Sequence, residues 1–171
     1  SNCEISEDLY YKVIEQKTAA LFESCCTIGA LSANASKEQI EKAKKFGHEL
    51  GVIFQIKDDI FDYYDSDEIG KPTGNDMTEG KLTLPVIYAL RSTNNEEMYS
   101  IARKVKNHDV TQEEIKQLVE FTKANGGIEY AEKVMADLHD SCNAYISENV
   151  SDPYIRESLY KYVEFVIQRT K

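Results

Sequence analysis

Apolar residues recur at three- and four-residue steps along most of this chain, which is the spacing of one face of an α-helix. Tyr10, Val13, Ile14, Leu21 and Phe22 are an early example. Only 8 glycines and 3 prolines occur in 171 residues, and this scarcity favours long helices over a turn-rich β fold. The length suits one hydrophobic core. We therefore predict an all-α helical bundle that forms a single domain over residues 1–171.

Helix start and stop signals divide the chain further. Capping boxes are predicted at Ser36-x-x-Gln39 and Thr111-x-x-Glu114. A left-handed C-terminal cap is predicted at Asn125-Gly126, and Asp152-Pro153 places a proline at a first helical position. The pattern predicts helices over residues 6–29, 36–65, 77 or 82 to 91, 94–108, 111–125, 127–149 and from 152 onward. A polar loop is expected over residues 66–75.

The charge balance argues against one class of partner. The formal net charge is −10, whereas a nucleic-acid surface needs clustered lysine and arginine, so we expect no nucleic acid. The chain has no apolar run long enough for a transmembrane segment and no signal peptide. The cysteines lack metal-ligand spacing and are interpreted as reduced thiols. We expect a soluble, cytoplasmic protein, and the start at Ser1-Asn2 without a methionine indicates a fragment.

Three carboxylates form the most informative cluster for function. Asp58 and Asp62 are four residues apart and Asp59 and Asp62 are three apart, so all three reach one patch of a helix. They crowd the expected C-terminal end of that helix, where negative charge opposes the macrodipole. A hard divalent cation such as Mg²⁺ prefers oxygen ligands and would relieve this repulsion. The alternative interpretation is a solvated acidic face.

Two glycines favour the metal site over the solvated face. Gly47 and Gly51 share a helical stripe with Gln55 and the acids, and each glycine costs a helix about 1 kcal/mol relative to alanine. We interpret this stripe as clearance for a bulky ligand above the carboxylates.

Basic residues lie before and after the acids. Lys17 falls four residues after Val13 and four before Leu21, on an apolar side where a lysine usually snorkels or pairs with an acid. A cation at the acids would keep room for phosphate oxygens, so the acids and the lysines together are interpreted as a metal–diphosphate site. Beside such a site Lys17 becomes a candidate phosphate ligand, and Thr18 supplies a hydroxyl.

The downstream lysines draw their meaning from their spacing. Lys71, Asp76 and Lys81 follow the acids at even intervals. Lys71 and Lys81 would both neutralise the phosphates of a diphosphate bound at the acids.

These motifs together resemble the C-terminal half of a trans-isoprenyl diphosphate synthase, a member of the polyprenyl synthetase family. The resemblance rests on Lys17-Thr18-Ala19, on the run from Phe54 to Asp62, and on the run from Gly70 to Pro85. The sequence of the last run is similar to the corresponding motif of medium- and long-chain members such as octaprenyl diphosphate synthases. Nothing after Pro85 is diagnostic.

The resemblance implies a prenyltransferase that condenses an allylic diphosphate with isopentenyl diphosphate to make a longer polyprenyl diphosphate, with Mg²⁺ as cofactor. The implied site residues are the metal ligands Asp58, Asp59 and Asp62 with Asp76 in support; the diphosphate ligands Lys17, Lys71 and Lys81; and the catalytic group Lys17, Thr18, Gln55 and Asp58. Within this group, Thr18 and Gln55 would face the developing allylic cation.

The family's first aspartate-rich motif, and the basic residues that bind isopentenyl diphosphate, have no match in this chain. We therefore expect the chain alone to be inactive and to need the missing N-terminal half or a partner subunit. Exposed inner faces should drive homo-oligomerisation. Two rivals stay open, a non-catalytic subunit of a heteromeric prenyl synthase and a helical interaction module with an inert acidic face. A terpene cyclase shares the chemistry, but the Lys-Thr and Gly-Lys spacing favours the synthases.

Overall fold

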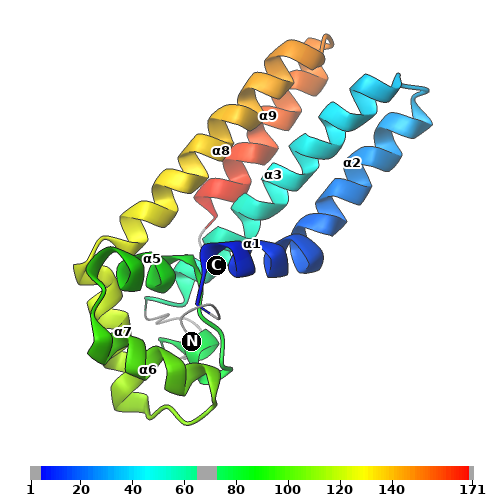
Figure 1. Cartoon of the computed structure of the whole chain (residues 1–171). Coiled ribbons are helices and arrows are strands. Elements are labelled where there is room, and N and C mark those ends of the chain that lie inside the picture. The colour runs from blue at the N-terminus through cyan, green and yellow to red at the C-terminus, as the bar shows by residue number, and fades with distance from the viewer. Residues whose placement is uncertain (1–4, 65–72, 170–171) are drawn as a thin grey trace. The chain divides into compact units, whose positions relative to one another are not determined.

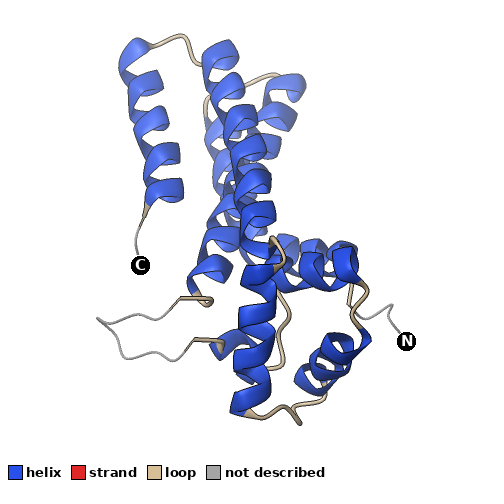
Figure 2. Ribbon diagram, turned by 90° about the vertical axis from the view of Figure 1, so that its left-hand side faces the viewer, coloured by secondary structure: helices blue, strands red, loops and turns tan. Residues whose placement is uncertain are grey.

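The computed structural model describes residues 5–64 and 73–169, and every regular element in these ranges is a helix (Figure 1, Figure 2). In chain order the elements are α1 (Glu7–Ile14), η2 (Glu15–Ala19, a π-helix), α2 (Ala20–Ser32), α3 (Lys37–Phe61), α4 (Asn75–Thr78), α5 (Leu84–Thr93), α6 (Glu96–Lys106), α7 (Gln112–Ala124), α8 (Gly127–Asn149) and α9 (Pro153–Gln168). The all-α prediction is confirmed. No helix within the described ranges is long and apolar enough to cross a membrane.

Most helix boundaries follow the local capping signals. At the start of α3 the N–H of Gln39 donates to the Ser36 hydroxyl at 3.2 Å, and the N–H of Ser36 donates to the Gln39 side chain at 2.8 Å. The other predicted caps are also formed, at Thr111–Glu114, Gly126 and Asp152-Pro153. These contacts join residues close in the chain, which is why a sequence pattern suffices to predict them.

The predicted end of the helix over residues 36–65 is wrong, because α3 stops at Phe61. The N–H of Asp62 bonds to the carbonyl of Asp59 at 3.3 Å, which is the tighter turn common at helix termini. The carbonyl of Asp62 then accepts a hydrogen bond from the N–H of Gly74 at 2.8 Å. A contact with a later segment of the chain therefore helps to end this helix.

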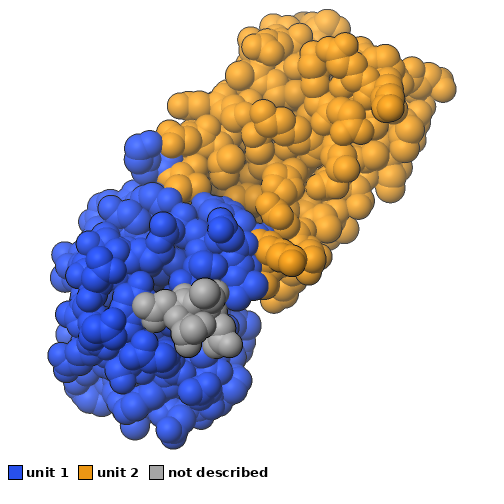
Figure 3. All heavy atoms as spheres, viewed as in Figure 1, with its two compact units in different colours: residues 1–11, 58–133 blue, residues 12–57, 134–171 orange. Residues whose placement is uncertain are grey.

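The chain divides into two compact units, coloured separately in Figure 3. Unit 1 comprises residues 1–11 and 58–133, and unit 2 comprises residues 12–57 and 134–171. The prediction of one domain over residues 1–171 stays a prediction.

Unit 1 is built around α5, α6 and α7. Its fully buried side chains include Leu84, Leu90, Val105, Ile115 and Leu118, and the burial of each contributes about 1.5–3 kcal/mol. The stacked rings of Tyr88 and Tyr130, with centroids 4.1 Å apart, join α5 to the first turn of α8. The helix expected from residue 77 or 82 is divided into α4 and α5.

Unit 2 packs α2, most of α3, most of α8 and α9. Ile53, Ile146 and Val163 are fully buried, one from each of α3, α8 and α9. Near the end of α9, the guanidinium of Arg169 donates to the carbonyl oxygen of Phe54 at 2.8 Å and lies 3.9 Å from the centre of that ring. This contact ties the end of α9 to α3.

Candidate functional site

The glycine stripe of α3 is covered by a neighbouring helix. A Cβ at Gly51 would lie 2.6 Å from the Cα of Ala19, and one at Gly47 would lie 2.6 Å from the carbonyl oxygen of Phe22. Both distances are too short for any side chain. The interpretation of these glycines as clearance for a ligand is therefore wrong. They allow η2 and α2 to approach the backbone of α3.

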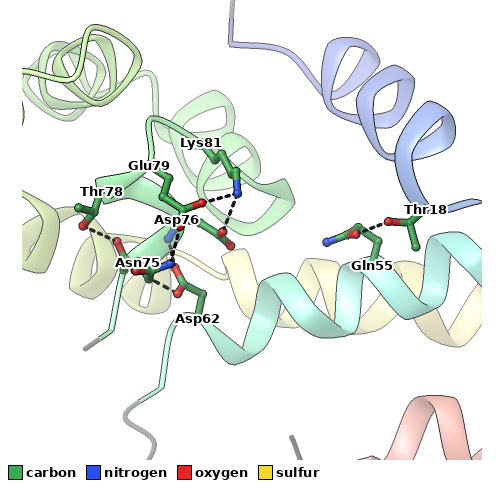
Figure 4. A network of polar contacts seen from close by, with 9 residues as sticks. Thr18, Gln55, Asp62, Asn75, Asp76, Thr78, Glu79 and Lys81 are labelled. Carbon is green, nitrogen blue, oxygen red and sulfur yellow. Dashed lines mark hydrogen bonds and ion pairs between the residues drawn. The ribbon is translucent and has the colours of Figure 1, made fainter. Parts of the chain in front are cut away.

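This close approach brings together two of the predicted catalytic residues. The hydroxyl of Thr18 in η2 donates to Oε1 of Gln55 in α3 at 2.7 Å (Figure 4). Gln55 follows Gly51 by four residues, so both lie on the face of α3 that meets η2. The small residues at the crossing thus position the Thr18–Gln55 pair within unit 2.

Lys17 lies in the π-helical turn η2 and is exposed. The apolar face predicted around it is not formed, since Val13 is 53% exposed and Leu21 is 66% exposed. Ile14 and Ala19 are buried instead. Hydrogen bonds from i to i+5 in a π turn shift the following residues around the helix, so a four-residue spacing no longer marks one face. Such turns are frequent at functional sites.

The three predicted metal ligands have different surroundings, all described here within unit 1. Asp58 is half-buried in the last turn of α3. Asp59 is only 4% exposed, and its Oδ2 accepts a hydrogen bond from the hydroxyl of Tyr10 in α1 at 2.6 Å. Sequence reasoning missed Tyr10, whose only signal was its place on an amphipathic helix. Burial, and then the charge of Asp59, raises the pKa of the Tyr10 hydroxyl well above its usual value.

Asp62 lies just beyond α3 and holds the start of α4. Its two carboxylate oxygens accept hydrogen bonds from the backbone N–H groups of Asn75 and Asp76, each at 3.0 Å (Figure 4). A carboxylate at this position satisfies N–H groups that a helix start leaves without intrahelical partners. Gly74, at the N-cap of α4, provides no side chain for this purpose.

Lys81 belongs to the segment that Asp62 holds. Its ammonium lies 2.5 Å from a carboxylate oxygen of Glu79 and 3.7 Å from one of Asp76 (Figure 4). The hydrogen bond to Glu79 is the largest cause of a raised pKa for Lys81, so the side chain stays cationic. Glu79 is a further charged neighbour that sequence reasoning did not assign. The predicted phosphate ligand Lys71 lies outside the described residues.

The donor set at the end of α3 fits a hard cation in its chemistry. Its side chains offer carboxylate oxygens, the ligands that Mg²⁺ prefers, and each oxygen has more than one lone pair, so a hydrogen bond does not preclude a metal contact. Bonds such as those at Asp59 and Asp62 are the kind that orient ligating carboxylates. Within the described residues, however, no three histidine, cysteine or acidic side chains are gathered closely enough to hold a metal ion.

Comparison with known proteins identifies the family. The family model described as polyprenyl synthetase matches residues 1–122. This chain belongs to the polyprenyl synthetase family. The match covers the Lys17-Thr18 pair, the acidic end of α3 and the segment up to Lys81.

Individual members of the polyprenyl synthetase family show the same relationship. The geranylgeranyl diphosphate synthase of Mycobacterium tuberculosis is 34% identical over 151 residues, which cover 88% of this chain and 43% of that protein. Component 2 of the heptaprenyl diphosphate synthase of Geobacillus stearothermophilus is 45% identical over 82 residues, 47% of this chain and 26% of that protein.

Solved structures of the family share the fold. The crystal structure of geranylgeranyl pyrophosphate synthase from Bacteroides thetaiotaomicron superposes with a TM-score of 0.89 at 44% identity, covering 96% of this chain and 53% of that one. The chain thus spans about half the length of the family members it matches, or less.

Proposed function

We propose that this chain supplies the acidic, diphosphate-binding part of a prenyltransferase. In the proposed reaction, the carbon–oxygen bond of an allylic diphosphate breaks and diphosphate leaves. The allylic carbon forms a new bond to the double bond of isopentenyl diphosphate, and a proton is then lost. The product is a longer polyprenyl diphosphate.

The observation that carries the proposal is the link between the acidic motif and Lys81. Asp62 follows the two other aspartates of the motif and bonds directly to the backbone of the segment that bears Lys81. Carboxylates for a cation and an ammonium for a phosphate therefore lie on one connected piece of unit 1. Membership of the polyprenyl synthetase family supports the same chemistry.

We assign the carboxylates to the cation and the lysines to the diphosphate. Asp58, Asp59 and Asp62, with support from Asp76, would hold Mg²⁺ together with oxygens of the bound diphosphate, since the described side chains alone do not gather into a metal site. The cation would neutralise charge on the leaving diphosphate. Lys81 binds diphosphate oxygens in unit 1, and the same role stays a prediction for Lys17 in unit 2 and for Lys71. Paired hydroxyl and amide dipoles, those of Thr18 and Gln55, stabilise the positive charge that develops on the allylic carbon.

The proposed activity also needs residues that this chain does not contain. We propose that a further polypeptide segment, in the same protein or in a partner subunit, supplies the site for isopentenyl diphosphate. The similarity to a protein named as component 2 of a heptaprenyl diphosphate synthase supports the alternative of a subunit in a heteromeric enzyme.

Self-association is a further part of the proposal. Large apolar side chains are exposed on α2 and α9, at Leu21, Ile28, Leu31, Tyr154, Ile155, Tyr162 and Phe165. Exposed apolar surface of this kind favours association. Light scattering at micromolar concentration should detect a dimer or larger species, and a monomer would contradict this part.

Calorimetric titration with inorganic diphosphate tests the site itself. The chain should bind diphosphate in the presence of Mg²⁺ and much more weakly without it. The variant Asp58→Asn should lose the Mg²⁺-dependent part and keep its helical circular dichroism spectrum. Binding that is indifferent to both Mg²⁺ and Asp58 would overturn the proposal. Incubation of the chain alone with both prenyl diphosphates should give no product.

A further inference from the structure

Asp59 is unusual among the charged residues that the structure describes. Of the aspartate, glutamate, lysine and arginine side chains in the described ranges, it alone is buried. A buried carboxylate is costly unless it is hydrogen-bonded. The hydroxyl of Tyr10, itself only 7% exposed, provides such a bond at 2.6 Å.

The Tyr10–Asp59 bond joins distant parts of the chain. The two residues are 49 positions apart and lie on α1 and α3. Asp59 stands beside Asp58 in the motif, so a restraint on its carboxylate acts on the last turn of α3. A hydrogen bond to an ionised oxygen, shielded from water, is stronger than a neutral one. Tyr10 therefore restrains the part of α3 that bears the acids.

We propose that Tyr10 is a positioning residue for the Mg²⁺–diphosphate site, acting through the carboxylate of Asp59. The inference rests on the proposed function, because it presupposes a cation at the end of α3. Removing a partner that orients a ligating group typically weakens metal binding by about 10- to 100-fold. Tyr10 itself does not touch the substrate, so its effect should pass through Asp59.

Unit 1 contains a matched control for this bond. The hydroxyl of Tyr130 donates to a carboxylate oxygen of Glu7 at 3.1 Å, so Tyr130→Phe removes the same kind of contact from the same unit. Neither Tyr130 nor Glu7 belongs to the proposed site. A general loss of a tyrosine–carboxylate bond is thereby separated from a loss at Asp59.

The experiment is a calorimetric titration of the full chain with Mg²⁺ at a constant concentration of inorganic diphosphate. Tyr10→Phe should raise the apparent Kd for Mg²⁺ by about 10- to 100-fold, while Tyr130→Phe should leave it within about twofold. Thermal melting of the metal-free proteins records any change in folding. If Tyr10→Phe lowers only the melting temperature and leaves the Kd unchanged, the positioning role is wrong and the proposed function stands.

A double-mutant cycle tests whether Tyr10 acts through Asp59. In the Asp59→Asn background, Tyr10→Phe should add little further loss of Mg²⁺ affinity, because contacting residues are coupled. An equal loss in both backgrounds would overturn the inference. Failure of the unsubstituted chain to bind diphosphate with Mg²⁺ would overturn the proposed site and the role of Tyr10 together.

Discussion

The carboxylate of Asp62 accepts a hydrogen bond from the backbone N–H of Asp76 at 3.0 Å and so connects the end of the acidic motif to the start of α4. The second oxygen of the same carboxylate accepts the N–H of Asn75. The Asp62 side chain thus holds the first turn of α4, and Lys81 follows this helix in the chain. Asp62 is therefore expected to matter for stability as well as for ligand binding.

Asp62→Asn should lower the free energy of unfolding by about 1 kcal/mol, the typical worth of a helix cap. An amide has one acceptor oxygen, so it cannot replace both bonds. Asp58→Asn removes one negative charge from the same helix end but leaves both bonds intact, and it serves as the control. Urea denaturation measures both variants, and equal stabilities would contradict the capping role.

Gly51→Ala should destabilise the chain by roughly 1–3 kcal/mol, the usual cost of overpacking. The new Cβ would lie 2.6 Å from the Cα of Ala19, which cannot move without its helix. Gly29→Ala in α2 is the control, because a Cβ there meets nothing within 4 Å. That variant should be stabilised by about 0.5–1 kcal/mol from helix propensity. Thermal melting of both variants should show opposite shifts, and shifts of the same sign would contradict the close approach at Gly51.

Arg169→Lys should lower the free energy of local unfolding at the end of α9 by roughly 1–3 kcal/mol. Lysine lacks the planar group that both stacks on the Phe54 ring and donates to the Phe54 carbonyl. Hydrogen exchange of the last amides of α9 should accelerate in this variant. Lys161→Ala removes an exposed ion pair with Glu157 on the same helix, and it should change exchange little. Similar exchange in the two variants would argue against the Arg169 contact.

Cysteine labelling should separate Cys25 from Cys142. Cys25 is exposed, whereas Cys142 is buried, and burial raises the pKa of the Cys142 thiol to about 12. Since the thiolate is the reactive form, a thiol reagent at pH 8 should modify Cys25 within minutes and Cys142 only after unfolding in urea. Mass spectrometry of the two peptides checks this, and rapid labelling of Cys142 in the folded chain would contradict its burial.

The same pKa shift predicts a loss of stability in alkali. The folded-state pKa of Cys142 lies above the thiol's ordinary value of 9.0, at about 12. Between these two values the unfolded chain releases a proton that the folded chain retains, so stability present below pH 9 is lost as pH rises toward 12. Urea midpoints from pH 8 to pH 11 should fall less in Cys142→Ala than in the unsubstituted chain. Parallel slopes would contradict the shift.

Local sequence signals determined much of this protein by themselves. The three- and four-residue apolar spacing predicted the all-α class, and the caps at Ser36, Thr111 and Asp152 predicted where helices begin. The acids at the end of α3 and the Lys17-Thr18 pair also identified the family. Each of these features depends on residues that are neighbours along the chain, so a sequence alone contains the information.

Tertiary structure decided how the candidate residues are held. The spacing of the acids placed Asp58, Asp59 and Asp62 on one helical patch, but Asp62 lies beyond the end of α3 and holds α4. Asp59 is buried against Tyr10, 49 positions away. Gly51 proved to be a helix-packing residue because Ala19, far away in sequence, lies against it. Helical periodicity specifies which face a residue occupies, whereas the partner that covers that face is set by the packing of distant segments.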